Sequence, residues 1–150
     1  MTNEKNTPAY SQSKNLGGEG YARPGRRTVC LARFSRACGI VKASDGSLLV
    51  VDQFNHCIRK VRDGQVTTLA GNGEEGEGDG EGAGFRAPRG AVLDSQGGTR
   101  ILVADWGNSR IAAVTMEGVV STLAEVQGVS DIAVAPDGTM VVLHGSQLST

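Results

Sequence analysis

Aromatic residues are scarce in this chain of 150 residues, which contains three Phe, two Tyr and one Trp. Any hydrophobic core must therefore be built from aliphatic side chains. No run of about 18 apolar residues occurs, so a membrane-spanning helix is excluded. Residues 1–14 contain no apolar segment of the kind that a secretory signal requires, so we expect no such signal.

Cysteine and net charge are also sparse. Cys30, Cys38 and Cys57 form an odd set without C-x-x-C spacing, which favours free thiols in a reducing compartment. We therefore expect a cytoplasmic protein; the Ser and Arg content would also suit a transit peptide, although Glu4 and Glu19 argue against one. The formal net charge of −1 predicts no general attraction to nucleic acid or to anionic lipid.

Glycine, in contrast, is abundant. The chain has 22 glycines, about twice the usual share of roughly 7%. Charge is unevenly distributed, because residues 21–36 carry five Arg and no acid, whereas residues 74–81 carry five acids and no base. Composition alone thus indicates a globular chain rich in turns with two locally charged segments.

The sequence repeats itself. Three segments of a first copy align with a second copy at offsets of 51 to 54: residues 32–40 with 83–91, 52–58 with 105–111, and 64–70 with 118–124. A third copy begins with D-I-A-V-A-P-D-G at position 131. Internal repetition at this period is typical of solenoids and propellers.

Each copy is expected to form short β-strands. The apolar runs predict strands over 40–43, 48–51, 58–61 and 66–69 in the first copy, and over 91–93, 101–104, 111–114 and 119–123 in the second. Asp-Gly pairs at 45–46 and 63–64 predict two-residue hairpin turns with positive φ at both central residues.

The second strand of each copy is apolar throughout, with the sequences L-L-V-V, I-L-V-A and M-V-V-L. Such runs are typical of strands that are covered on both faces, whereas an isolated antiparallel sheet shows one polar face. Stacked propeller blades cover both faces of each sheet. We therefore favour a propeller, with a β-sandwich as the structural alternative.

The motif D-x-x-N-x-x-I, followed by a D-G or E-G turn and by V-T-T-L-A-G, resembles the NHL repeat. The resemblance covers residues 32–144 and implies an all-β propeller of four-stranded antiparallel blades. Such propellers serve mainly in protein recognition; some bind RNA, and one branch is a zinc-dependent lyase that cleaves peptidyl-hydroxyglycine.

Closed propellers have 4–8 blades, and this sequence holds two full repeats and a partial third. We therefore expect a partial propeller, a fragment of a larger ring that is completed by the rest of a longer chain or by self-assembly. The expected division is a disordered or loosely ordered segment at 1–31, a first blade at 32–71, an acidic Gly-rich connector at 72–84, a second blade at 85–125 and a partial third blade at 126–150.

Matching polar residues stand at the corner after the second strand of two copies. They are Asp52 with Asn55 and Asp105 with Asn108, and their side chains can accept backbone N–H bonds and close the turn. Because they recur, we expect them to be structural. In the third copy H-G-S-Q replaces this motif, so its corner is expected to be degenerate.

Trp106 is not required by the repeat, because the first copy has Gln53 at the same place. An exposed aromatic residue near Arg89 and Arg110 is the kind of anchor that dominates protein interfaces, so we expect these three residues to contact a partner. The alternative is that Trp106 packs on a neighbouring blade.

The acidic connector contains G-N-G-E-E-G, which matches G-x-G-x-x-G only formally. No helix or βαβ pattern surrounds it, and its carboxylates would repel phosphate. We expect a solvated flexible loop, with a surface for a basic partner and a calcium loop as alternatives.

His56 and His144 are the only histidines. Zinc catalysis needs about three protein ligands and an open fourth position, so no catalytic residue, metal or cofactor is expected, and the zinc lyase stays an alternative. Only Tyr21 and Phe34 accompany the arginines of 21–36, too few for base stacking. A protein-binding scaffold is therefore favoured, with RNA binding as a further alternative.

Overall fold

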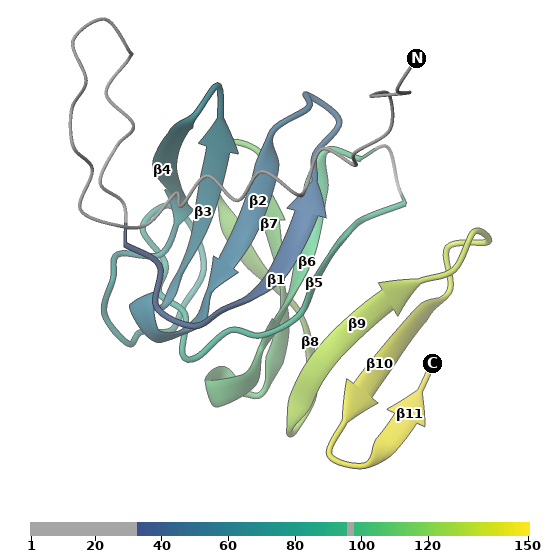
Figure 1. Cartoon of the computed structure of the whole chain (residues 1–150). Helices are drawn as coiled ribbons and strands as arrows, with labels where there is room; N and C mark the ends of the chain where they lie inside the picture. The colour runs from purple at the N-terminus through teal and green to yellow at the C-terminus, as the bar shows by residue number, and fades with distance from the viewer. Residues whose placement is uncertain (1–32, 96–97) are drawn as a thin grey trace, which may run out of the picture.

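A computed structural model describes residues 33–95 and 98–150, which fold into three antiparallel sheets (Figure 1). Blade 1 contains β1 (Ala37–Lys42), β2 (Leu48–Asp52), β3 (Cys57–Arg62) and β4 (Gln65–Ala70). Blade 2 contains β5 (Ala91–Leu93), β6 (Arg100–Asp105), β7 (Arg110–Thr115) and β8 (Val120–Glu125). Blade 3 contains β9 (Val129–Val134), β10 (Met140–His144) and β11 (Gln147–Ser149). The expectation of disorder over 1–31, most of the arginine-rich segment and Cys30 lie outside the described residues.

Every blade is a meander, in which each strand pairs with its neighbours in the sequence. Two 3₁₀ turns, η2 (Gln53–Asn55) and η3 (Trp106–Asn108), follow the second strands of blades 1 and 2. The all-β prediction is confirmed, and each expected strand of the first two copies coincides with an observed one to within three residues at either end. None of the helices in the part of the chain that the structure covers is long and apolar enough to cross a membrane.

The two Asp-Gly pairs form different hairpins. At 63–64 both residues have positive φ, 51° at Asp63 and 75° at Gly64, as expected for a two-residue turn. At 45–46 the prediction is wrong, because only Gly46 has positive φ and its N–H bonds to Ala43 O across a three-residue loop. The Asp45 carboxylate accepts the N–H of Ser47 at 2.9 Å, which favours this wider turn.

Side chains from adjacent blades meet in two apolar cores. Along β6, Ile101 and Val103 point into the core shared with blade 1, whereas Leu102 and Ala104 point into the core shared with blade 3. All four are buried, which follows from the alternation of side chains along a strand. Blade 2 therefore lies between the other two, and Figure 1 shows it behind blade 1 with β9–β11 to one side.

The prediction that second strands are covered on both faces holds only for β6. In β2, Leu49 and Val51 are buried against blade 2, but Leu48 is 37% exposed. In β10, Val142 is buried whereas Leu143 is 38% exposed. The physical reason is that blades 1 and 3 each have only one neighbouring blade among the described residues.

The first strands of the three blades lie close together. The backbone of Gly90, just before β5, donates its N–H to Ser130 O in β9 at 3.2 Å. A Cβ at Gly90 would lie 2.8 Å from Asp131 Cα, closer than real side chains approach. Glycine is therefore needed here for the blades to converge at their first strands, as the blades of a propeller do.

Phe85 is the largest fully buried side chain and lies in the core between blades 1 and 2. We predict that Phe85→Ala lowers the free energy of unfolding by about 3–5 kcal/mol, because it removes apolar contacts and leaves a cavity. Phe54→Ala is the matched control: Phe54 is 52% exposed, so its loss should cost within about 1 kcal/mol. Urea unfolding followed by circular dichroism measures both, and similar losses would contradict the assigned core.

Candidate functional site

The corners after β2 and β6 are built on two fully buried carboxylates, Asp52 and Asp105. Asp52 Oδ1 accepts the backbone N–H of Ser35 at 2.7 Å, and Asp105 Oδ1 accepts that of Arg86 at 2.8 Å. Ser35 and Arg86 each precede the first strand of their blade. The carboxylate therefore joins the entry segment of a blade to the corner after its second strand.

Asn55 and Asn108 complete this arrangement. Each amide donates to the second oxygen of its Asp at 2.8 Å, and also to a backbone oxygen of the segment before the blade, Arg33 O in blade 1 and Gly76 O in blade 2. These residues are thus placed in structural contacts, although they bind the entry segment and give no side-chain cap to the 3₁₀ turn.

Each Asp also pairs with an arginine, and the two arginines stand at different positions of the repeat. Arg59 Nε lies 3.2 Å from Asp52 Oδ2, and Arg110 Nε lies 2.8 Å from Asp105 Oδ2. The same arginines donate to equivalent threonines of the fourth strand, Thr68 and Thr122. Sequence alignment misses this equivalence, because Arg59 follows its Asp by seven residues and Arg110 by five.

Arg110 organises the acidic connector as well. Its guanidinium donates to Gly78 O at 2.8 Å, Gly84 O at 3.1 Å and Asp79 Oδ1 at 3.1 Å. Hydrogen bonds from Thr122, and then the nearby Arg110, hold the pKa of the Asp79 carboxyl below its usual value. The side chain of Arg110 is only 7% exposed. Its expected place in a partner interface is therefore corrected to an internal one.

The connector is not the freely solvated loop that its composition suggests. Gly76 N–H bonds to Phe85 O at 3.0 Å, and Gly80 exchanges two backbone hydrogen bonds with Val120 at 2.7 and 3.2 Å. Ala83 and Phe85 are buried at its end. The order of the connector could not be seen from its glycine and acid content, because two of its partners, Val120 and Arg110, lie well after it in the sequence.

Two arginine–aromatic pairs lie at the surface of the corners. The guanidinium carbon of Arg89 is 4.3 Å from the centre of the Trp106 ring, and Trp106 is 42% exposed. Arg36 lies 5.3 Å from the centre of the Phe54 ring in the same way. Sequence reasoning identified Trp106 and Arg89 but missed the second pair. In the alignment of the two copies Arg36 falls opposite Ala87 and Arg89 opposite Cys38, so the repeat gives no signal for the second pair.

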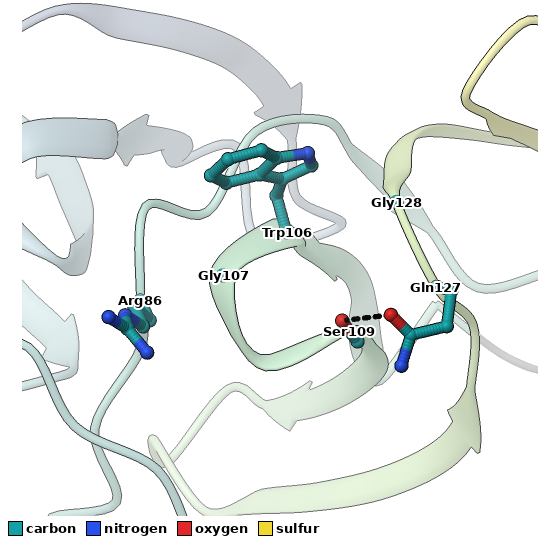
Figure 2. Close-up of a pocket in the computed structure, with 6 residues that line it drawn as sticks. All are labelled: Arg86, Trp106, Gly107, Ser109, Gln127 and Gly128. Carbon is teal, nitrogen blue, oxygen red and sulfur yellow. Dashed lines mark hydrogen bonds between the residues drawn. The ribbon is translucent and has the colours of Figure 1, made fainter.

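A shallow pocket of about 430 Å³ adjoins Trp106 (Figure 2). Its lining consists of Arg86, Trp106, Gly107, Ser109, Gln127 and Gly128. Ser109 Oγ donates to Gln127 Oε1 at 3.2 Å, which links the corner to the segment before blade 3. Figure 2 shows the Trp106 ring standing above the turn of η3, between Arg86 and the segment of Gln127 and Gly128.

His56 and the two cysteines of the described residues, Cys38 and Cys57, lie among structural contacts. His56 Nδ1 accepts the N–H of Ala87 at 3.0 Å, so it joins the corner of blade 1 to the entry segment of blade 2. Cys38 and Cys57 are free thiols, and burial raises the pKa of both. Over residues 33–95 and 98–150, no three His, Cys, Asp or Glu side chains gather in a group that could hold a metal ion.

No family model matches the chain. Among curated proteins, it is similar to Protein SUPPRESSOR OF QUENCHING 1, chloroplastic, of Arabidopsis thaliana, with 37% identity over 82 residues. The match covers 52% of this chain and 8% of that protein. The chain therefore matches only a small part of a much longer relative.

Solved structures with the same fold include a gluconolactonase from Xanthomonas campestris, with a TM-score of 0.60 and 17% identity over 75% of this chain and 36% of that one. An auxiliary nutrient binding protein from Bacteroides ovatus gives 0.57 and 16%, over 69% and 33%. Virginiamycin B lyase from Staphylococcus aureus gives 0.55 and 13%, over 75% and 36%. The fold is thus that of a β-propeller, and the chain spans about a third of each neighbour. Their different functions assign none to this chain.

The buried Asp105–Arg110 pair gives a direct test of the corner. We predict that Arg110→Ala lowers the free energy of unfolding by about 3–5 kcal/mol, because it leaves Asp105 buried without its cation. Arg59→Ala is the matched control, with an expected loss of roughly 1–2 kcal/mol, because the Arg59 side chain is 23% exposed and water can replace it. Urea denaturation measures both, and equal losses would show that Arg110 is not the organising residue.

Proposed function

We propose that this chain is an NHL-type propeller segment that acts as a non-catalytic scaffold for a protein partner. Its contact surface is the corner face, defined as Arg36, Phe54, Arg89, Trp106 and the pocket beside Trp106. The observation that carries the proposal is the exposed Trp106 ring, covered by Arg89 and placed at the edge of that pocket. Tryptophan and arginine are the residues most enriched at the centres of protein interfaces.

The NHL assignment is supported by the contacts of the motif residues. In D-x-x-N-x-x-I, the Asp and Asn bind the entry segment of each blade, and Ile58 and Ile111 are fully buried. The motif therefore describes one structural unit that is present twice. Both units present an aromatic residue at the turn that the motif fixes.

The scaffold role is supported by the rigidity of this turn. Trp106 directly follows the buried Asp105, and Gly107 N–H bonds to Arg86 O at 2.7 Å. A side chain on such a loop loses little conformational freedom when a partner binds. Recognition loops that are held by a rigid sheet scaffold are common in proteins of this architecture.

The chemistry of the face favours an acidic segment of the partner. Neither Arg36 nor Arg89 forms an ion pair or a side-chain hydrogen bond with residues 33–95 or 98–150. A guanidinium that stacks on a ring keeps its in-plane N–H donors for a carboxylate. The guanidinium groups of Arg36 and Arg89, one on each of two adjacent blades, would bind two carboxylates of an extended peptide.

Trp106 is the only tryptophan, so intrinsic fluorescence reports contact at the corner face. We predict that peptides selected from a random library on the purified chain are acidic and shift the Trp106 emission to shorter wavelength. For a labelled selected peptide, Trp106→Ala should weaken binding by at least about 2 kcal/mol, roughly 30-fold. Fluorescence anisotropy measures this affinity.

Leu123→Ala is the control, because Leu123 is an exposed leucine of β8 that does not line the pocket beside Trp106, and its loss should leave the affinity unchanged. Arg89→Gln should weaken the acidic peptide in the same direction as Trp106→Ala. Peptides that bind the wild type and Trp106→Ala equally would refute the corner face as the contact surface. Salt-sensitive retention on RNA by the chain, with no acidic peptide selected, would instead support the RNA alternative.

A further inference from the structure

Two apolar sheet faces, at opposite ends of the row of blades, are not covered by the residues that the structure describes. The leading face is the outer face of blade 1, where Ile40, Leu48 and Val50 lie on one side; Ile40 is 65% exposed. The trailing face is the outer face of blade 3, where Leu143 pairs with Leu148, which is 71% exposed. In Figure 1 blade 1 lies in front of blade 2, and blade 3 lies to one side of them.

The leading face has a buried counterpart in blade 2. The repeat places Leu48 and Val50 at the positions of Ile101 and Val103, at an offset of 53. Ile101 and Val103 are fully buried, and they pack against blade 1. The leading face therefore has the side chains and the strand register that blade 2 uses to receive the blade before it.

The trailing face has a buried counterpart in blade 1. Alignment of the Asp-Gly turns at 45–46 and 137–138 places Val141 and Leu143 at the positions of Leu49 and Val51. Leu49 and Val51 are 1% exposed, and they pack against blade 2. The trailing face thus corresponds to the surface with which blade 1 contacts the blade after it.

We infer that a second copy of this chain covers both faces, with the trailing face of each copy packed on the leading face of the other. The same contact, trailing surface on leading surface, occurs twice within the chain, between blades 1 and 2 and between blades 2 and 3. Two copies would place six blades in a ring, within the 4–8 blades of closed propellers. The assembly is a heterologous contact that closes on itself.

Charge favours this orientation over a contact between identical faces. Lys42 is exposed on the leading face beside Leu48, its pairing partner. On the trailing face side, Asp131 pairs with Leu143, but its carboxylate is directed at Gly90 in the entry of blade 2. A contact between two leading faces would bring two Lys42 side chains to one apolar interface, and a contact between a leading and a trailing face avoids this like-charge repulsion.

Sedimentation velocity of the purified 150-residue chain tests the inference. The wild type should be a discrete dimer, and Leu48→Asp and Leu143→Asp should each raise its dissociation constant at least tenfold. Leu123→Asp is the matched control, since Leu123 is exposed on β8 of the middle blade and should leave the dimer intact. Circular dichroism should show all three variants folded, because each replaced leucine is at least 37% exposed.

Mixing the two interface variants separates the possible arrangements. Equal amounts of Leu48→Asp and Leu143→Asp retain one intact trailing-on-leading contact and should form a heterodimer. A wild-type monomer would overturn the inference and assign the open faces to other residues of the protein. A dimer that resists Leu143→Asp would overturn it too, because it would show that identical leading faces pair. Sedimentation measures the dimer without any partner peptide. The proposed dimer and the proposed binding of a partner at the corner face can therefore fail independently.

Discussion

The structure depends on a buried carboxylate placed where the second strand of a blade ends. Asp105 is removed from water and would be costly unless every oxygen were bound. The backbone N–H of Arg86, the amide of Asn108 and the guanidinium of Arg110 bind it. Each of these partners belongs to a different segment. One side chain therefore fixes the entry into the blade, the corner and the start of β7 at the same time.

Blade 3 shows what the carboxylate does, because His144 stands in its place. There the chain turns at Gly145, with φ of 57°, and β10 pairs directly with β11. No 3₁₀ turn forms, and a single backbone bond from Gly145 N to Gly128 O, at 3.2 Å, joins the corner to the entry segment. Among the three corners that the structure describes, the two that contain Asp display an exposed Phe or Trp ring. The backbone of a single turn thus connects the buried Asp, with its hydrogen-bond partners, to the exposed aromatic residue.

Local pattern was enough to predict the strands, the two complete corners and the turn at Asp63-Gly64, because each is specified by residues within a few positions. The prediction failed where a distant side chain decides the outcome. The residues next to Arg110 in the sequence suggest that it is a surface cation, yet its guanidinium binds the connector about 30 residues earlier. The exposure of Leu48 could not be read from L-L-V-V either, because the coverage of a strand depends on which blades flank it. The pair of Phe54 and Arg36 was missed since cation–π contact requires a fold to bring the two together.

The direction of the strands determines where both the corner face and the open blade faces lie. Alternation along each strand directs apolar side chains toward the neighbouring blades, whereas the clamped corners lie at the ends of the strands. A contact of trailing face on leading face would repeat the rotation that relates consecutive blades. Both copies of such a ring would therefore display their corner faces at the same end. Two identical recognition surfaces on one end would strengthen binding to a partner with repeated acidic segments, because the second contact becomes intramolecular.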